Sequence, residues 1–282
     1  MRSPRERQRQ KERRIAMLAA AGGVLVVVAV AAVVIHGTRT RVDRDPVTQC
    51  PTNRPLSAYT AVLIDATDEL NTVQSKFVMD AVTAVVDSLP ENGRLDLFVL
   101  EGAGGDHDPP FRRKVCRCNP GRSDSDADIG LTDNPALQRK RWQEDYLEPV
   151  RAALDSALTR APSDRTPLLR AIQAVALASP IGAQNPEPVE GRRRLLIVSD
   201  MLEHTDDYSH YRTARASLAA LRALPAYPRL RTDLRGSEVE ILYVRRDDPG
   251  ARRIQGRAHV GFWEDYFDAN HGLLRRVVQV QG

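Results

Sequence analysis

Three short polar segments carry the residues whose types and spacing could do chemistry. Asp65, Thr67 and Glu69 follow one strand-like apolar run, Thr166 opens a helical pattern, and Asp200 closes a later apolar run. Carboxylate and hydroxyl oxygens are the ligands that hard divalent cations prefer. Open α/β sheets bind their ligands outside the carboxyl ends of the strands, where both aspartates are expected to lie. The pattern therefore predicts a divalent-cation site.

The same spacing resembles the metal-ion-dependent adhesion site of von Willebrand factor type A (vWA) domains, over roughly residues 57–282. That family has Asp-x-Ser-x-Ser, a distant Thr and a later Asp, which hold magnesium or manganese. An open position on the metal takes a carboxylate from a protein partner. The resemblance implies Mg²⁺ or Mn²⁺, with Ca²⁺ as a further candidate, bound by Asp65, Thr67, Glu69, Thr166 and Asp200, and an unidentified protein partner.

Glu69 stands where the family has a second hydroxyl. If Asp65, Glu69 and Asp200 all approached the ion, they would more than neutralise its charge and weaken the attraction for a partner's carboxylate. Alternatively, Glu69 lies in the first turn of the next helix, where the helix dipole favours a carboxylate. Thr166 also has a plain structural interpretation, as the N-cap of a helix that begins with a proline.

Two further polar groups are weaker candidates. Asp124 to Asp128 alternate as in a calcium loop, but the sixth position lacks glycine and the twelfth is Pro135 instead of the required glutamate. A solvated acidic loop is the preferred interpretation. His204 and His210 flank an acidic stretch after Asp200, and their expected positions in a loop and at a helix start explain them without a catalytic role.

Enzyme signatures are mostly absent, so the chain is not expected to be an enzyme. The competing hypothesis is a metal-assisted phosphohydrolase similar to haloacid dehalogenases, with Asp65 as nucleophile. That family has a second aspartate two positions on, where this chain has Thr67, and a later lysine, whereas no lysine follows Lys140.

Residues 15–35 contain no charge over 21 positions. At about 1.5 Å per residue they would cross a hydrocarbon core of roughly 30 Å, so they predict a transmembrane helix. The alternative is a cleaved signal peptide, since Ala29-Val30-Ala31 suits a signal peptidase, but this site lies inside an unusually long apolar run. We expect a single-pass signal-anchor in the cell membrane.

Residues 1–14 carry seven Lys or Arg against two Glu. Basic flanks remain on the cytoplasmic side, which places the C-terminal domain outside the cytoplasm. This tail accounts for the whole formal net charge of +4. The rest of the chain is therefore close to neutral and has no electrostatic footprint for nucleic acid.

The remaining chain is expected to have a linker at 36–58 and one domain at 59–282. Strands alternate with helices, which predicts a doubly wound α/β fold with a mostly parallel sheet flanked by helices, vWA- or Rossmann-like. The apolar patterns predict strands at 59–64, 94–100, 111–118 (an edge strand), 195–198 and 239–244. They predict helices at 73–86, 138–160 with a kink at Pro149, 167–179 and 208–224, and a last helix whose aromatic residues Phe262, Trp263, Tyr266 and Phe267 pack on the sheet.

Three cysteines, Cys50, Cys116 and Cys118, lie in a domain expected outside the cytoplasm. Cys50 is expected to form a disulfide with one of the other two, which leaves one thiol. The long segment 101–137 around these cysteines and the imperfect metal motif also suit a metal-free scaffold of the same fold in an envelope assembly.

Overall fold

The computed structural model describes residues 17–18, 20–32, 42–101, 111–122, 134–158, 163–213 and 216–282. It divides into two units, Met1–Asp43 and Arg44–Gly282. In the first unit, residues 17–18 and 20–32 are helical. Among the described residues, no helix is both long and apolar enough to cross a membrane. The tail 1–14, the ends of the predicted span 15–35 and the acidic segment Asp124 to Asp128 lie outside the described residues.

The second unit is built on a six-stranded sheet with strand order β3-β2-β1-β4-β5-β6. All neighbouring strands are parallel except β3, an edge strand that runs antiparallel to β2. The strand order reverses direction between β1 and β4, which confirms the doubly wound fold. The strands are β1 Tyr59–Asp65, β2 Arg94–Leu100, β3 Phe111–Cys118, β4 Arg193–Ser199, β5 Glu238–Val244 and β6 Leu273–Val280.

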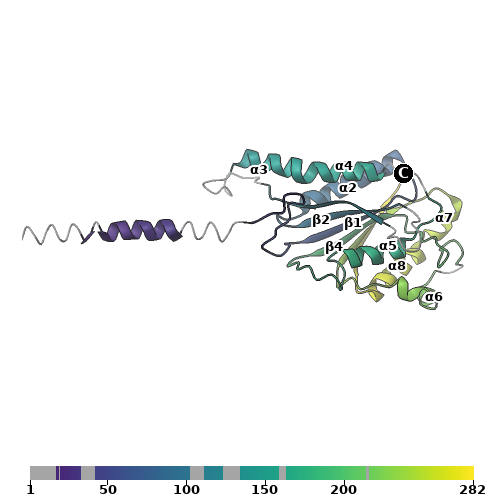
Figure 1. Cartoon of the computed structure of the whole chain (residues 1–282). Helices are drawn as coiled ribbons and strands as arrows, with labels where there is room; N and C mark the ends of the chain where they lie inside the picture. Colours follow the sequence, from purple (N-terminus) through teal and green to yellow (C-terminus); the bar gives the residue numbers. More distant parts are fainter. Residues whose placement is uncertain are drawn as a thin grey trace, which may run out of the picture. The chain divides into compact units, whose positions relative to one another are not determined.

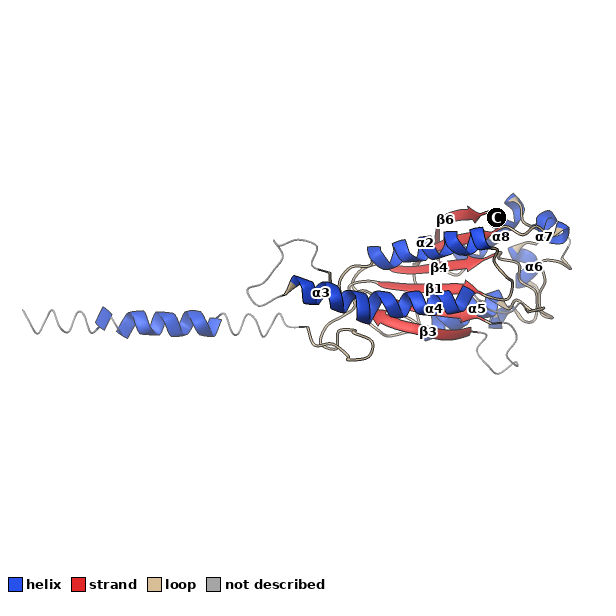
Figure 2. Cartoon of the chain, turned by 90° about the horizontal axis from the view of Figure 1, so that it is seen from above, coloured by secondary structure: helices blue, strands red, loops and turns tan. Residues whose placement is uncertain are grey.

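Helices cover both faces of this sheet (Figures 1 and 2). On one face lie α2 Thr72–Ser88, α3 Pro135–Arg141, a π-helix at Trp142–Leu147 and α4 Glu148–Leu158. On the other face lie α5 Leu168–Ala178, α6 Leu218–Arg222 and α8 Arg257–Ala269. A 3-10 turn at Tyr227–Arg229 and α7 Pro249–Ile254 complete the unit. Each face has its own apolar core, as a buried parallel sheet requires.

The apolar spacing predicts an inner face of helix α2 formed by Val73, Phe77, Val78, Ala81, Val85 and Val86, of which Val78, Val85 and Val86 are buried. Val73 and Phe77 are 64% and 41% exposed, whereas Gln74 is buried. The Gln74 side chain forms a capping box with Asn71 and donates a hydrogen bond to the carbonyl of Arg245. Because these bonds satisfy the buried amide, Gln74 takes the inward position that the apolar pattern assigned to Val73 in the first turn.

The helix predicted at 138–160 is present from Pro135 to Leu158, with a π-helical middle in place of a kink. Pro149 has no N–H to donate to the preceding turn. The N–H of Glu148 donates instead to the carbonyl of Gln143, five residues earlier. The wider turn accommodates the proline without breaking the helix.

The helix predicted at 208–224 is wrong over its first part, and among the described residues of this range only Leu218–Arg222 are helical. Residues 210–212 form a turn instead. The Thr205 hydroxyl accepts from the N–H of Tyr208, and the Thr213 hydroxyl donates to the carbonyl of Ser209. Such local side-chain bonds compete with helical ones. The final strand β6 was not predicted either, whereas the aromatic residues of α8 are buried as expected.

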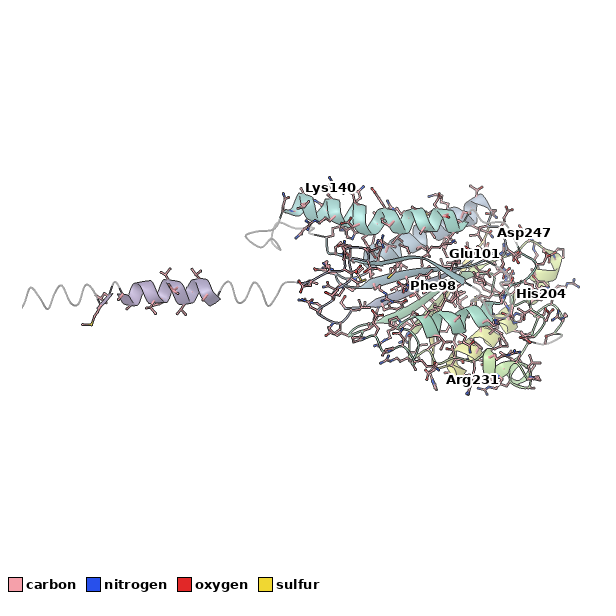
Figure 3. The ribbon with its side chains drawn as sticks, viewed as in Figure 1. Phe98, Glu101, Lys140, His204, Arg231 and Asp247 are labelled. Atoms are coloured by element: carbon pink, nitrogen blue, oxygen red, sulfur yellow. A yellow bond between two sulfur atoms is a disulfide. The ribbon has the colours of Figure 1, made fainter. Side chains whose placement is uncertain are left out.

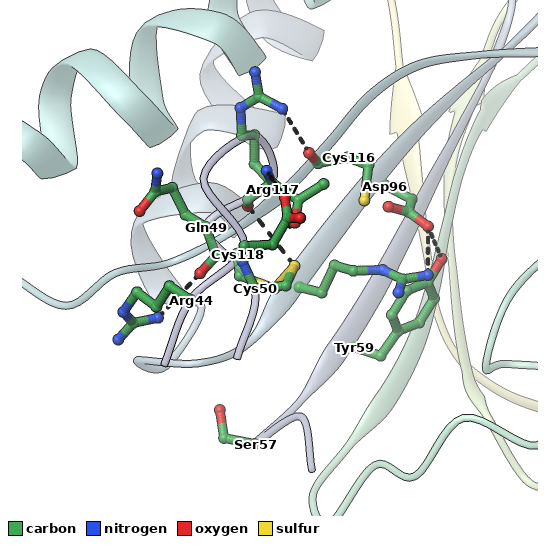
Figure 4. The surroundings of a disulfide bond; sticks show 12 residues. Arg44, Gln49, Cys50, Ser57, Tyr59, Asp96, Cys116, Arg117 and Cys118 are labelled. Carbon is green, nitrogen blue, oxygen red and sulfur yellow. Dashed lines mark hydrogen bonds and ion pairs between the residues drawn. A yellow bond between two sulfur atoms is a disulfide. The ribbon is translucent and has the colours of Figure 1, made fainter. Parts of the chain in front are cut away.

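The compact unit starts at Arg44, inside the segment predicted as a linker at 36–58. Leu56 belongs to the core and is 3% exposed. A disulfide joins Cys50 to Cys118 of β3, and Cys116 keeps a free thiol (Figure 4). The expected bond from Cys50 is therefore confirmed, and it ties the first residues of the unit to the edge of the sheet.

Candidate functional site

The loops after β1, β4 and β5 lie at one end of the sheet, which we call the carboxyl edge (residues 66–71, 200–213 and 245–248). Figure 3 shows this end of the domain, with His204 of the β4 loop and Asp247 of the β5 loop. Asp65 closes β1 and Asp200 follows β4, and these two strands are paired in parallel register. The switch point of the sheet therefore brings the two predicted aspartates to the same place.

Asp65 lies at the centre of a network of hydroxyl groups. The Thr67 hydroxyl donates to Oδ1 of Asp65 over 2.6 Å, and the Ser199 hydroxyl donates to Oδ2 over 2.6 Å. Oγ1 of Thr166 is 2.9 Å from Oγ1 of Thr67. Because the Thr67 proton points to Asp65, Thr166 must supply the proton of that second bond. The Thr166 hydroxyl thus donates to the Thr67 hydroxyl, which in turn donates to the Asp65 carboxylate.

Asp200 is held from two sides and is only 1% exposed. Its Oδ1 accepts the N–H of Leu202 over 2.9 Å, and its Oδ2 accepts Nε–H of Arg246 over 2.8 Å. Met201, between Asp200 and Leu202, has a φ of 62°, a left-handed conformation that is unusual for a residue with a side chain. This turn directs the carboxylate of Asp200 towards the loop after β5.

Arg246 is the functional residue that sequence reasoning missed. It enters from the loop after β5, the neighbour of β4. Beyond its bond to Asp200, its Nη1 donates to the carbonyl of Glu69 over 2.7 Å, and its Nη2 lies 3.4 Å from Oδ2 of Asp68. The guanidinium therefore joins the loops after β1 and β4 at the place where the sequence predicted a metal ion.

Glu69 does not take its predicted position in the first turn of the next helix. Its side chain is exposed, and the interaction described for it is the backbone bond to Arg246. Helix α2 has Asn71 as its N-cap, so Glu69 precedes the helix and lies outside its first turn. The structure brings together Asp65, Thr67, Thr166 and Asp200, whereas Glu69 takes part in the described contacts through its backbone carbonyl.

A divalent cation does not fit these residues while Arg246 is in place. Both oxygens of Asp65 and of Asp200 already accept hydrogen bonds, and the threonine hydroxyls bind each other. A dication about 4 Å from the guanidinium would be repelled by roughly 8 kcal/mol at an effective dielectric constant of about 20. Within the described part of the chain, no group of three or more His, Cys, Asp or Glu residues is arranged to hold a metal ion.

The buried carboxyl groups of the site are difficult to ionise. Burial raises the pKa of Asp200 to about 7, although Arg246 acts in the opposite direction. Burial also raises the pKa of Asp65, and the hydrogen bonds from Ser199 and Thr67 oppose this shift. Asp65 is 5% exposed, and the cavity beside it measures about 10 Å³. That is room for about one water molecule.

Thr166 is not the N-cap of the following helix. Helix α5 begins at Leu168, and Pro167 occupies the cap position without a side-chain bond. Instead, the carboxyl group of Glu203 accepts the N–H of Leu169 over 2.8 Å and the hydroxyl hydrogen of Thr205 over 3.1 Å. Glu203 is fully buried, and it provides from a distant loop the acceptor that a helix start requires.

Replacing Glu203 with glutamine is expected to change how stability depends on pH. Burial raises the pKa of Glu203 from 4.5 to about 8. Because the folded pKa is the higher one, the carboxyl group stabilises the fold fully below pH 4.5 and loses this contribution as the pH rises through about 8. Each pH unit in this interval lowers the free energy of unfolding by up to about 1.4 kcal/mol.

Glu203→Gln keeps the shape and the acceptor for Leu169 but does not titrate, so it should become more stable than wild type as the pH rises from 6 to 8. Urea unfolding at pH 5 to 9 measures this, and Glu190→Gln, at an exposed site, is the control. Parallel curves for Glu203→Gln and wild type would exclude a buried, titrating Glu203.

The two histidines after Asp200 are structural. Nδ1 of His204 lies 2.8 Å from the hydroxyl of Ser209, and Nδ1 of His210 accepts the N–H of Glu203 over 2.9 Å. Burial lowers the pKa of His210 to about 2, so it is neutral at physiological pH. Its ring contacts the aromatic residues of α8, including Phe262. These contacts fix the loop after β4.

The comparisons with known proteins are remote. The sequence matches no family model, and no curated protein sequence matches it. An aerotolerance-related membrane protein from Bacteroides fragilis NCTC 9343, with multiple mutations to serines, is 13% identical with a TM-score of 0.35; the match covers 79% of this chain and 91% of that one. A von Willebrand factor type A protein from Catenulispora acidiphila is 12% identical with a TM-score of 0.32, over 77% of this chain and 42% of that one. With identities this low and both TM-scores below 0.5, neither match carries an argument about this chain.

Proposed function

We propose that this chain is a vWA-like docking domain of the cell envelope, and that it binds a protein partner at the carboxyl edge without a divalent cation. The observation that carries the proposal is the position of Arg246. Its guanidinium bonds to Asp200 at 2.8 Å and bridges to Asp68 and the Glu69 carbonyl. The loops that a metal would organise are therefore joined by a side chain of the chain itself. This favours the metal-free form of the docking hypothesis.

The location outside the cytoplasm is supported by the disulfide. A bond between Cys50 and Cys118 persists in oxidising compartments and is rare in the cytosol. It agrees with the topology expected from the basic tail 1–14 and the apolar run 15–35. We propose that this run anchors the chain in the membrane, with the domain on the extracytoplasmic side.

The carboxyl edge has the character of a docking surface. Tyr211 is 47% exposed there, and its ring contacts His204 edge to face. Two exposed ion pairs lie around it, Arg165 with Asp206 and Arg252 with Asp247, each at 2.6 Å. An aromatic anchor within a polar, charged rim is the usual composition of protein interfaces.

Site-specific photocrosslinking in cells tests the proposal. A photoreactive residue in place of Tyr211 in the full chain is expected to give a discrete crosslinked protein, with the same yield with and without EDTA. The matched control replaces Leu177, which is 48% exposed at the other end of α5. Crosslinks that disappear with EDTA would contradict the metal-free mode, and crosslinks only from position 177 would contradict docking at the carboxyl edge.

A further inference from the structure

The side chain of Arg246 is an internal cation among oxygen atoms that would otherwise suit a metal. It is 16% exposed, and it contacts two carboxylates and one carbonyl from two different loops. We propose that Arg246 keeps a divalent-cation site latent, and that the same oxygens bind Mn²⁺ or Mg²⁺ once the guanidinium is removed. This inference deepens the proposed function and rests on its metal-free form, because it names the residue that makes docking independent of metal.

Removal of the guanidinium would free an all-oxygen set of ligands. Oδ2 of Asp200, Oδ2 of Asp68 and the carbonyl of Glu69 lose their contacts to Arg246. These are two carboxylates and one carbonyl, oxygens that suit Mg²⁺ and Mn²⁺, and the remaining positions would be filled by water.

The charges of the site lead to the same conclusion. Asp68 and Asp200 lie against the Arg246 guanidinium, at 3.4 Å and 2.8 Å. Without the guanidinium, the negative charge of these carboxylates is left uncompensated in a largely buried place, which is unfavourable. A divalent cation restores the balance, whereas in the wild-type protein it would meet a positive charge that is already present.

The loop that carries Arg246 is held by bonds that do not involve the guanidinium. The backbone N–H of Arg246 donates to Oε1 of Gln255, over 2.9 Å. Nε2 of Gln255 donates to the carbonyl of Asp200 over 3.1 Å and to that of Val244 over 2.7 Å. Shortening or neutralising the Arg246 side chain should therefore leave the loops after β4 and β5 in place.

The test compares thermal unfolding of the full-length chain in EDTA with unfolding in MnCl₂, MgCl₂ or CaCl₂. Arg246→Met removes the charge and keeps an aliphatic stem, and Arg246→Lys keeps the charge. Arg252→Met is the matched control, because Arg252 pairs only with the exposed Asp247 among the partners described for it. A second change, Asp200→Asn, is added to Arg246→Met to remove the central ligand.

Wild type, Arg246→Lys and Arg252→Met are expected to be indifferent to the metals. Arg246→Met should gain a rise in Tm of roughly 5 to 10 °C in Mn²⁺ at about a hundred times Kd, and Asp200→Asn should abolish this gain. A similar metal-dependent rise in wild type would overturn the inference, and so would a folded Arg246→Met variant that no metal stabilises.

If Arg246→Met folds only in the presence of Mn²⁺, that dependence itself supports the latent site. If it does not fold at all, the Mn²⁺ electron paramagnetic resonance signal in the presence of wild type and of Arg246→Lys decides the matter. Mn²⁺ binding to either protein at millimolar concentration would contradict the exclusion of the metal by the positive charge. The absence of binding to wild type and to Arg246→Lys alike would support it. These readouts involve no partner protein, so their failure is distinguishable from a failure of docking.

Discussion

Arg246→Ala is expected to destabilise the domain by about 3 kcal/mol at pH 8, because breaking a buried ion pair leaves a charge without its partner. Asp200 is 1% exposed, and its Oδ2 would lose the bond to Nε at 2.8 Å. Burial already raises the pKa of Asp200 to about 7 in the presence of Arg246, and it would rise further in the variant. At pH 5 Asp200 is mostly protonated in both proteins, so the difference in stability should shrink.

Urea unfolding of wild type and variant at pH 8 and pH 5 measures this difference. Arg252→Ala is the control, because the exposed pair of Arg252 and Asp247 should contribute no more than about 1 kcal/mol. Asp200→Asn combined with Arg246→Ala completes a double-mutant cycle and isolates the coupling between the two side chains. A loss in Arg246→Ala no larger than in Arg252→Ala, at both pH values, would show that the buried pair contributes no more to stability than an exposed one.

Loss of the disulfide is expected to have an equally large effect. Cys50 and Cys118 are 68 residues apart in the sequence, and in the chain-entropy model a closed loop of this length stabilises the fold by about 4 kcal/mol. Cys50→Ser and Cys118→Ser should therefore each lower the free energy of unfolding by this order. Dithiothreitol should lower it in wild type and leave both variants unchanged.

Cys116→Ser is the control for the disulfide, since Cys116 holds a free thiol in the same strand, two residues before Cys118. Burial raises the pKa of this thiol to about 12, and the carboxylate of Asp96 adds to the shift. The thiolate is therefore scarce at neutral pH, and exchange with the neighbouring disulfide should be slow. A loss in Cys116→Ser equal to that in Cys118→Ser would argue against the pairing of Cys50 with Cys118.

The sequence predicted those parts of the fold that depend on local patterns. The apolar run of β1 is buried over its whole length, as expected for a central strand of a parallel sheet. The convergence of Asp65 and Asp200 followed from the rule that parallel strands end at one edge of the sheet. The burial of Trp263 and Tyr266 followed from the spacing of aromatic residues along α8.

The parts that could not be predicted depend on contacts between distant residues. Arg246 is 46 residues from Asp200 and 177 from Glu69, and a long side chain after a strand gives no sign of its direction. Its only signal was the position of two arginines just after the strand next to β4. Glu203 is 34 residues from the helix start that it caps. Such an acceptor is invisible to rules that search the residues next to a helix.

In the proposed function, a guanidinium takes the place of a divalent cation between the loops after β1 and β4. A crystal structure of the protein grown in millimolar MnCl₂, with anomalous diffraction data collected near the manganese edge, tests it most directly. We expect Arg246 bonded to Asp200 and Asp68, and no anomalous peak at the carboxyl edge. A manganese peak bound by Asp65, Thr67 and Asp200, with the Arg246 side chain turned away, would contradict the claim.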